Sequence, residues 1–179
     1  YQKEIDGKIE SIEQKHIMRY QQMFASLTVR EKIDKGITSG IIWHTQGSGK
    51  TALSYNLTKV LSDYFSKNNK VAKFYFIVDR LDLLSQASEE FAARGLIVKT
   101  AKNSEELMEQ FKNNQAQDGN TGKAEITVVN IQRFDESEEN INMSAYATEL
   151  QRVFIIDEAH RGYKKEGSFL ANLLEADKK

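Results

Sequence analysis

The stretch His44-Thr45-Gln46-Gly47-Ser48-Gly49-Lys50-Thr51 decides the fold of this chain. It follows a short apolar run, Ile41-Ile42-Trp43, which predicts a buried strand, and it opens a helical pattern from Lys50 to about Phe65. In a strand, loop and helix of this kind, the backbone N–H groups of the loop and the helix N-terminus can surround a polyphosphate. Lys50 then reaches the β- and γ-phosphates, and the Thr51 hydroxyl holds Mg²⁺. The sequence therefore predicts a nucleotide site at residues 45–51.

One position of this loop departs from the general phosphate-loop pattern G-x-x-x-x-G-K-[ST]. His44 stands where the first glycine is expected. The second glycine of the pattern, Gly49, is present, and the loop also contains Gly47. A side chain at either one would push a phosphate away from the loop amides. An ordinary glycine-rich turn is the alternative, and the flanking strand and helix favour the phosphate loop.

A second motif consists of the apolar run Val153-Phe154-Ile155-Ile156 followed by Asp157-Glu158-Ala159-His160. An Asp at the carboxyl end of a parallel strand beside a phosphate loop is where a Mg²⁺-holding carboxylate belongs, so we assign that role to Asp157. Glu158 is then placed to orient and deprotonate an attacking water. An exposed turn is the alternative for paired acids after a strand.

The remaining apolar runs alternate with helical patterns. Short strands are expected at residues 72–78, 96–98, 126–129 and 153–156, and helices at residues 81–91 and from residue 104. Strands buried on both faces and separated by helices predict an α/β sandwich with a mostly parallel central sheet.

The N-terminal region shows a different pattern. Between Ile5 and Ile33, apolar residues recur at helical spacings among charges, which predicts one or two amphipathic helices. We therefore divide the chain into an N-terminal helical segment, residues 1–36, and a nucleotide-binding domain, residues 37–179. Because Tyr1 opens the chain and an apolar pattern runs into its last residues, we expect a fragment of a longer protein.

Composition excludes several classes of function. With no Cys and three His, the chain can form neither a disulfide framework nor a Cys/His zinc cluster. A net charge of -1 excludes a generally basic surface, so any contact with DNA must be local. Nothing approaches the roughly 18 consecutive apolar residues of a membrane span, and we expect a soluble, cytoplasmic protein.

The order of these motifs resembles the first RecA-like domain of superfamily 2 helicases and translocases, and in particular the motor (R) subunit of type I restriction enzymes. Four segments carry the resemblance: the phosphate loop with its His, the V-D-R-x-D-L-x-x-Q pattern at residues 78–86, I-Q-R-F at residues 131–134, and D-E-A-H-R at residues 157–161. The resemblance implies a three-layer, RecA-like P-loop NTPase fold.

The resemblance also implies roles for residues outside the two central motifs. Arg19-Tyr20-Gln21-Gln22 is similar to an R-x-x-Q element whose Gln recognises adenine, which puts that role on Gln22, or on Gln21 if the register slips. His160 is expected to couple the nucleotide site to motion. The expected DNA contacts are Arg80, Gln132 and Arg133. Each has an alternative: Arg80 can cap a strand end, Gln132 can be solvated, and Arg133 can pair with an acidic neighbour.

The function that the resemblance implies is ATP hydrolysis, with Mg²⁺, to translocate double-stranded DNA in a complex with methyltransferase (M) and specificity (S) subunits. A T-G-T-P-like segment, a second RecA-like domain and a nuclease motif are missing from the sequence. We therefore expect this chain to bind nucleotide, to hydrolyse it poorly and to cut no DNA. The alternatives are another superfamily 2 DNA or RNA helicase, and a nucleotide-gated scaffold that does not hydrolyse.

Overall fold

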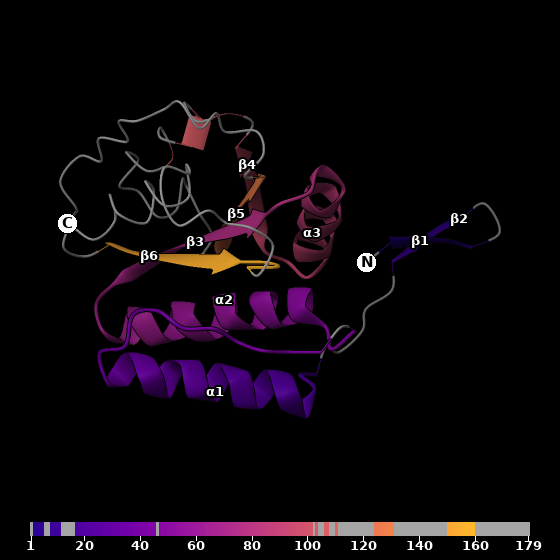
Figure 1. Cartoon of the computed structure of the whole chain (residues 1–179). Coiled ribbons are helices and arrows are strands. Elements are labelled where there is room, and N and C mark those ends of the chain that lie inside the picture. The colour runs from indigo at the N-terminus through magenta and orange to yellow at the C-terminus, as the bar shows by residue number, and fades with distance from the viewer. Residues whose placement is uncertain are drawn as a thin grey trace.

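A parallel sheet of four strands lies at the centre of the computed structural model, with the strand order β4-β5-β3-β6 (Figure 1). The strands are β3 (Val71–Val78), β4 (Ile97–Ala101), β5 (Glu125–Asn130) and β6 (Leu150–Ile156). The structure describes residues 2–5, 8–11, 17–45, 47–101, 103, 106–107, 110, 124–130 and 150–159. The sheet confirms the predicted fold class and four of the five predicted strands.

Two helices cover one face of this sheet, namely α2 (Lys50–Lys67) and α3 (Leu81–Ala93) (Figure 1). Alternate residues of the central strand β3 point toward them, because successive side chains of a strand face opposite ways. The resulting core joins both helices to the sheet. Its buried members are Leu61, Phe65, Phe74, Phe76, Val78, Ala87, Phe91, Leu96, Ile126 and Val128.

A third helix, α1 (Tyr20–Asp34), lies on the outer side of α2, away from the sheet (Figure 1). Val29 and Ile33, in its second half, pack against the core. Its first half buries polar residues instead, since Gln22 and Ser26 are 3% and 2% exposed. Helix α1 is therefore attached to the rest of the fold by polar contacts near its N-terminus and by apolar contacts near its C-terminus.

The sequence predicted a helix from Ile5 onward, but the described residues at the N-terminal end are strands. Residues Gln2–Ile5 (β1) and Lys8–Ser11 (β2) pair as antiparallel strands and stand apart from the sheet (Figure 1). Among the described residues of the predicted range, Tyr20–Asp34 form the helix. The physical reason is that backbone pairing across a tight connection satisfies N–H and C=O groups that a short isolated helix would leave unpaired. The division at residue 36 stays a prediction.

The predicted strand Ile41-Ile42-Trp43 is wrong. These residues form no ladder, and Ile41 and Trp43 are 86% and 87% exposed. Within the described residues, β6 pairs only with β3. A run of three apolar residues gains few ladder hydrogen bonds, and these do not offset the conformational entropy lost on ordering it. Segment 37–45 therefore reaches the phosphate loop as irregular chain.

Candidate functional site

The candidate site lies at the carboxyl end of the sheet, where the loop before α2 meets the turn after β6. Gly47 and Gly49 have φ angles of 76° and 81°, and Gly49 directly precedes the helix. This left-handed backbone is accessible to Gly at little cost and strained for other residues. The two glycines thus shape the loop that presents Lys50 at the first position of α2.

Lys50 and Glu158, 108 residues apart in the sequence, form an ion pair across this site. The Lys50 Nζ donates to the Glu158 Oε1 at 3.0 Å, and the two side chains are 37% and 25% exposed. Glu158 has a φ of 49°, which is uncommon for a residue other than Gly. The turn after β6 therefore adopts an unusual backbone that presents an acid to the loop lysine.

Asp157 directly follows β6 and is held by the backbone of its neighbours. Its N–H donates to the Ile77 carbonyl at 2.9 Å, and its Oδ1 accepts the Glu158 N–H at 3.0 Å. Partial burial raises the pKa of Asp157, and repulsion by Glu158 and Asp79 adds to this rise, while the Glu158 N–H and Lys50 oppose it. The site thus holds acidic groups that a cation would stabilise.

Two side chains at the start of α1 bond to carbonyls of the phosphate loop. The Gln22 Nε2 donates to the Gly49 carbonyl at 3.1 Å, and the Arg19 Nη1 donates to the Gly47 carbonyl at 3.4 Å. The Gln22 Oε1 accepts the N–H of Arg19 at 3.0 Å, which caps the helix. Both ends of the buried Gln22 amide are therefore engaged with the protein, whereas the Gln21 Oε1 is buried without a partner in the described structure.

The polar groups of the site suit a phosphate and a Mg²⁺ ion. The Ser48 hydroxyl is buried and has no partner among the described residues, and Thr51 lies one residue after Lys50 in α2. Hydroxyl and carboxylate oxygens are hard ligands that Mg²⁺ prefers, and it usually binds one or two carboxylates together with substrate phosphates. The described residues contain no cluster of three acidic or His side chains that could hold a metal alone.

The remaining predicted site residues differ in their surroundings. Thr45 is exposed in the loop. Arg80 pairs with Asp82 through two contacts of 3.1 and 2.8 Å, at an exposed site just after β3. His44 is half-buried, with its Nδ1 buried and without a partner in the described part, whereas Trp43 projects outward. Four predicted residues lie outside the described ones: Gln46, Gln132, Arg133 and His160.

Comparison with known proteins gives this geometry a context. The family model described as "Type III restriction enzyme, res subunit" matches residues 15–179, which is most of the chain and includes every motif discussed above. The chain belongs to this family. Like other members of it, the chain has a RecA-like P-loop fold.

Several curated relatives of this restriction-enzyme family are similar to the chain. The "Type I restriction enzyme SsaAORF53P endonuclease subunit" of Staphylococcus saprophyticus is 36% identical over 149 residues, which are 80% of this chain and 14% of the relative. The SauMSSORF170P endonuclease subunit of Staphylococcus aureus is 33% identical over 150 residues, again 80% and 14%. The HindI endonuclease subunit of Haemophilus influenzae is 30% identical over 132 residues, or 73% and 12%.

These matches confirm the predicted resemblance to the first helicase domain of the type I motor subunit. The chain spans about one seventh of the length of the staphylococcal relatives. None of the solved structures matches it. None of the described helices combines the length and the apolarity that crossing a membrane requires.

The family motif V-D-R contains a site residue that the sequence reasoning missed. Asp79 follows β3, beside the turn that carries Asp157, and it contributes to the raised pKa of Asp157. Its Oδ1 is buried without a partner among the described residues. The signal was available, because Asp79 ends a central parallel strand next to β6, and the carboxyl ends of parallel strands meet at one edge.

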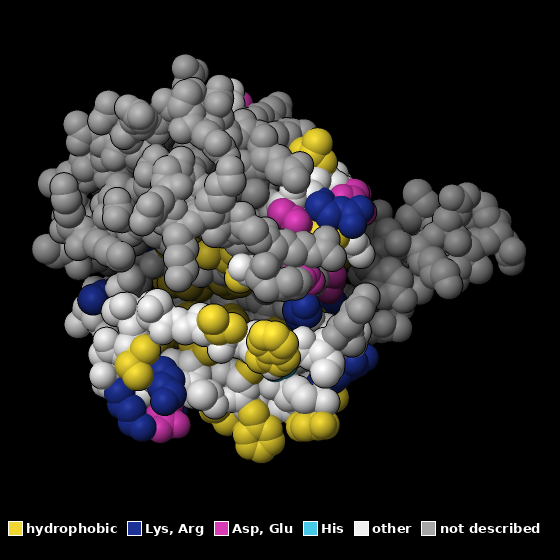
Figure 2. Space-filling model, viewed as in Figure 1, with side chains coloured by type: hydrophobic (Ala, Val, Ile, Leu, Met, Phe, Trp, Pro, Cys, Tyr) yellow, Lys and Arg dark blue, Asp and Glu magenta, His cyan; other side chains and the backbone are white. Residues whose placement is uncertain are grey.

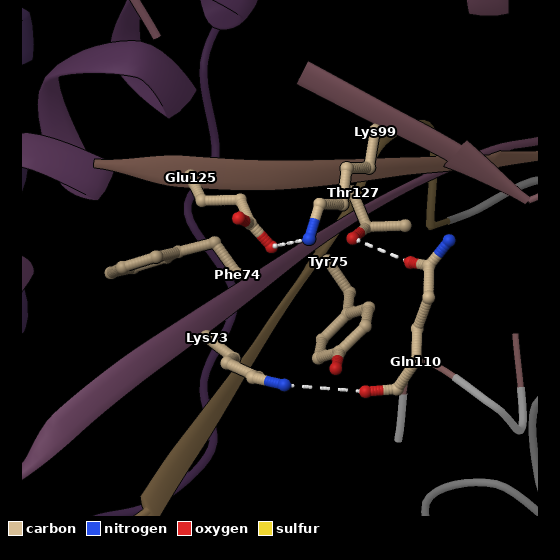
Figure 3. Close-up of a pocket in the computed structure, with 7 residues that line it drawn as sticks. All are labelled: Lys73, Phe74, Tyr75, Lys99, Gln110, Glu125 and Thr127. Carbon is tan, nitrogen blue, oxygen red and sulfur yellow. Dashed lines mark hydrogen bonds and ion pairs between the residues drawn. The ribbon is translucent and has the colours of Figure 1, made fainter. Parts of the chain in front are cut away.

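A pocket on the sheet lies apart from this site, toward the amino ends of the strands (Figure 3). Its polar groups contact one another: Lys99 pairs with Glu125 at 3.1 Å, Thr127 donates to the Gln110 Oε1 at 2.9 Å, and Lys73 donates to the Gln110 carbonyl at 3.3 Å. These contacts satisfy the groups that would otherwise bind a ligand. The pocket is therefore a structural feature of the sheet, and it lies apart from the ion pair between Lys50 and Glu158.

Proposed function

We propose that the chain binds Mg·ATP and that it is the ATP-hydrolysing motor portion of a type I restriction endonuclease subunit. The observation that carries this proposal is the 3.0 Å contact between Lys50 and Glu158. It brings the phosphate-binding lysine and a candidate general base from distant motifs to one point. The two left-handed glycines and the family match support the same assignment.

In this proposal each residue of the site has one task. The amides of residues 47–51 and the Lys50 ammonium bind the β- and γ-phosphates, since the helix N-terminus and the lysine both favour negative charge. Glu158 orients the attacking water and accepts its proton. Thr51 and Asp157 would hold Mg²⁺, which neutralises charge that develops on the phosphate oxygens. Thr45 and Gln46 complete the nucleotide contacts. Gln22 would read adenine after its amide leaves the Arg19 N–H and the Gly49 carbonyl, and Gln21 is the alternative reader.

The finer proposals concern the complete complex. There the motor would translocate double-stranded DNA, held by phosphate contacts from Arg80, Gln132 and Arg133, with His160 coupling the nucleotide site to motion. Its partners would be the methyltransferase and specificity subunits, in the cytoplasm of a bacterium or archaeon. What supports these steps is the similarity to type I endonuclease subunits.

Thermal unfolding of the chain with and without Mg·ATP tests nucleotide binding. A ligand at about 100 times its Kd stabilises the folded state by about 2.7 kcal/mol, which raises Tm by several degrees. Lys50→Ala should abolish this shift. Because the substitution also removes the ion pair, the relevant quantity is the shift on adding nucleotide, not the Tm itself. An equal shift in Lys50→Ala would overturn the proposal.

Hydrolysis is tested separately, in the complete complex. Glu158→Gln keeps the size of the side chain and removes the base, so we expect ATP turnover and DNA translocation to fall at least about 100-fold. Translocation that persists at the normal rate would exclude Glu158 as the base. A complete complex that binds ATP but neither hydrolyses it nor translocates DNA, with Glu158 in place, would favour a nucleotide-gated scaffold. The chain alone should hydrolyse ATP poorly, since an arginine finger from elsewhere is worth about 10³–10⁵ in rate in GTPases.

A further inference from the structure

The first half of helix α1 carries large apolar side chains on the outside of the molecule. Tyr20, Met23, Phe24 and Leu27 are 67%, 44%, 60% and 48% exposed. Their spacing of three, four and seven residues places them on one face of the helix. We call these four residues the outer face of α1.

The inner side of the same half of the helix is polar and already occupied. Gln22 and Ser26 are almost fully buried there; Gln22 bonds to the Gly49 carbonyl, and the Ser26 hydroxyl donates to the Gln22 carbonyl at 2.8 Å. An ordinary surface helix shows the reverse arrangement, with its apolar stripe inward. The core therefore makes no use of the outer face, and its apolar character needs another explanation.

Hydrophobic side chains stand out on this side of the molecule, over α1 and along the irregular segment in front of α2 (Figure 2). The four side chains of the outer face expose roughly 400 Å², taking about 150–250 Å² for each fully exposed large side chain. Contiguous patches of this size on a monomer are often functional. They also lie well below the roughly 800 Å² per partner that a stable interface between separate proteins buries.

We propose that the outer face of α1 is a docking surface for an apolar segment from another part of the same endonuclease subunit. This inference rests on the proposed function in one respect, namely that the chain works within a longer subunit. The staphylococcal relatives supply the argument for the occupant, because the chain covers only 14% of them. Within one polypeptide the effective concentration is high, so a contact of this size can persist where two separate copies would dissociate.

The docked segment would have a mechanical consequence for the nucleotide site. Arg19 and Gln22 hold carbonyls of the phosphate loop from the first turn of α1. Whatever covers the outer face therefore also fixes the helix that holds the loop. A neighbouring domain docked there gains a direct structural connection to the phosphate loop.

Single cysteines test the proposal in the complete subunit, and the absence of Cys from these 179 residues makes the new thiols unique to this region. Phe24→Cys and Leu27→Cys lie on the outer face. Lys32→Cys is the matched control, because Lys32 is exposed on the same helix and, at about 3.6 residues per turn, lies outside that face. The rate of modification by a small maleimide is followed at each site by peptide mass spectrometry, in native buffer and in guanidinium chloride.

We expect the new thiols at positions 24 and 27 to react at least about tenfold more slowly than the thiol at position 32 in the native subunit, and all three to react equally when unfolded. Equal native rates would overturn the proposal. Protection that disappears on dilution, together with a dimer in sedimentation, would overturn it in favour of a second copy. If both outer-face variants fail to fold while Lys32→Cys folds, the surface is buried, which supports docking. None of these measurements uses ATP. The docking proposal can therefore fail or hold independently of nucleotide binding, which the shift in Tm with Mg·ATP tests.

Discussion

Replacing Glu158 by Gln should tighten ATP binding while it stops hydrolysis. The Lys50 Nζ donates to the Glu158 Oε1 at 3.0 Å. Lys50 must turn from this carboxylate toward the phosphates when a nucleotide binds. The ion pair therefore competes with ATP, and its free energy is subtracted from the free energy of binding.

The magnitude follows from the burial of the pair. Fully exposed ion pairs contribute about 0–1 kcal/mol, and this pair is partly exposed, so we take about 1 kcal/mol as its strength. Because about 1.4 kcal/mol corresponds to a tenfold change in affinity, releasing Lys50 should lower the Kd for ATP about fivefold. Removing a negative charge beside the phosphates acts in the same direction.

Isothermal titration of the chain with Mg·ATP measures this change. The matched control is Glu125→Gln, which removes a carboxylate paired with Lys99 at 3.1 Å, with the two side chains 14% and 32% exposed. That pair lies toward the other end of the sheet, so its loss should change the Kd by less than about twofold. The reasoning is refuted if Glu158→Gln binds ATP no more tightly than the wild type, or if both variants tighten it equally.

Four further substitutions test the phosphate loop and the acid that lies beside it. Gly49→Ala should lower the free energy of unfolding by about 2–3 kcal/mol, because φ is +81° and the new Cβ would lie 2.8 Å from the Gln22 Nε2. Gly47→Ala has open space around the new Cβ, so it should lower the free energy of unfolding by only about 1 kcal/mol. Gln22→Leu leaves a helix N–H and the Gly49 carbonyl without partners, and urea titration should show a loss of about 1–3 kcal/mol. Asp157→Asn should stabilise the chain at pH 7 without Mg²⁺, with a smaller effect near pH 3, as urea titrations at both pH values would show.

The sign of the Asp157 effect follows from linkage. Its pKa in the folded state lies above the ordinary value, so the folded state binds the proton more tightly than the unfolded state. That stabilisation is present at acid pH and is lost as the pH rises through the folded pKa. Asn stays neutral and avoids the loss. An Asn variant that is less stable than the wild type at pH 7 would contradict this prediction. Equal losses of stability in Gly49→Ala and Gly47→Ala would separately contradict the prediction for the loop.

The sequence predicted the elements that local patterns determine. The aromatic and β-branched residues of β3 can form little but a buried central strand, and Lys50–Lys67 is a helix that opens directly after a glycine loop. Asp6-Gly7 is a pair of residues that is common in hairpin turns, and it predicts the β1-β2 pairing. This signal is stronger than the helical spacing of Ile5 and Ile9, which favours a helix. That part of the fold could therefore have been predicted.

Partners that are distant in the sequence could not be predicted in the same way. Whether Ile41-Ile42-Trp43 becomes a strand depends on a ladder partner, which is a property of the sheet and not of these three residues. The contact between Lys50 and Glu158 joins two motifs, and only the order of parallel strands brings them together. Roles that depend on a bound nucleotide or on DNA stay predictions.

Helix α1 shows what the spacing of apolar residues can and cannot predict. Apolar residues at helical spacing identify a face, but they do not say which surface that face meets. Here the phosphate loop presents carbonyls, which need N–H donors, so the side chains turned toward it are Arg19 and Gln22. The apolar residues Tyr20, Met23 and Leu27 must then point away, whatever their hydrophobicity. The first half of α1, which serves a polar loop on its inner side, can bury its outward apolar residues only against something outside its own domain, whereas Val29 and Ile33 in the second half pack against the core.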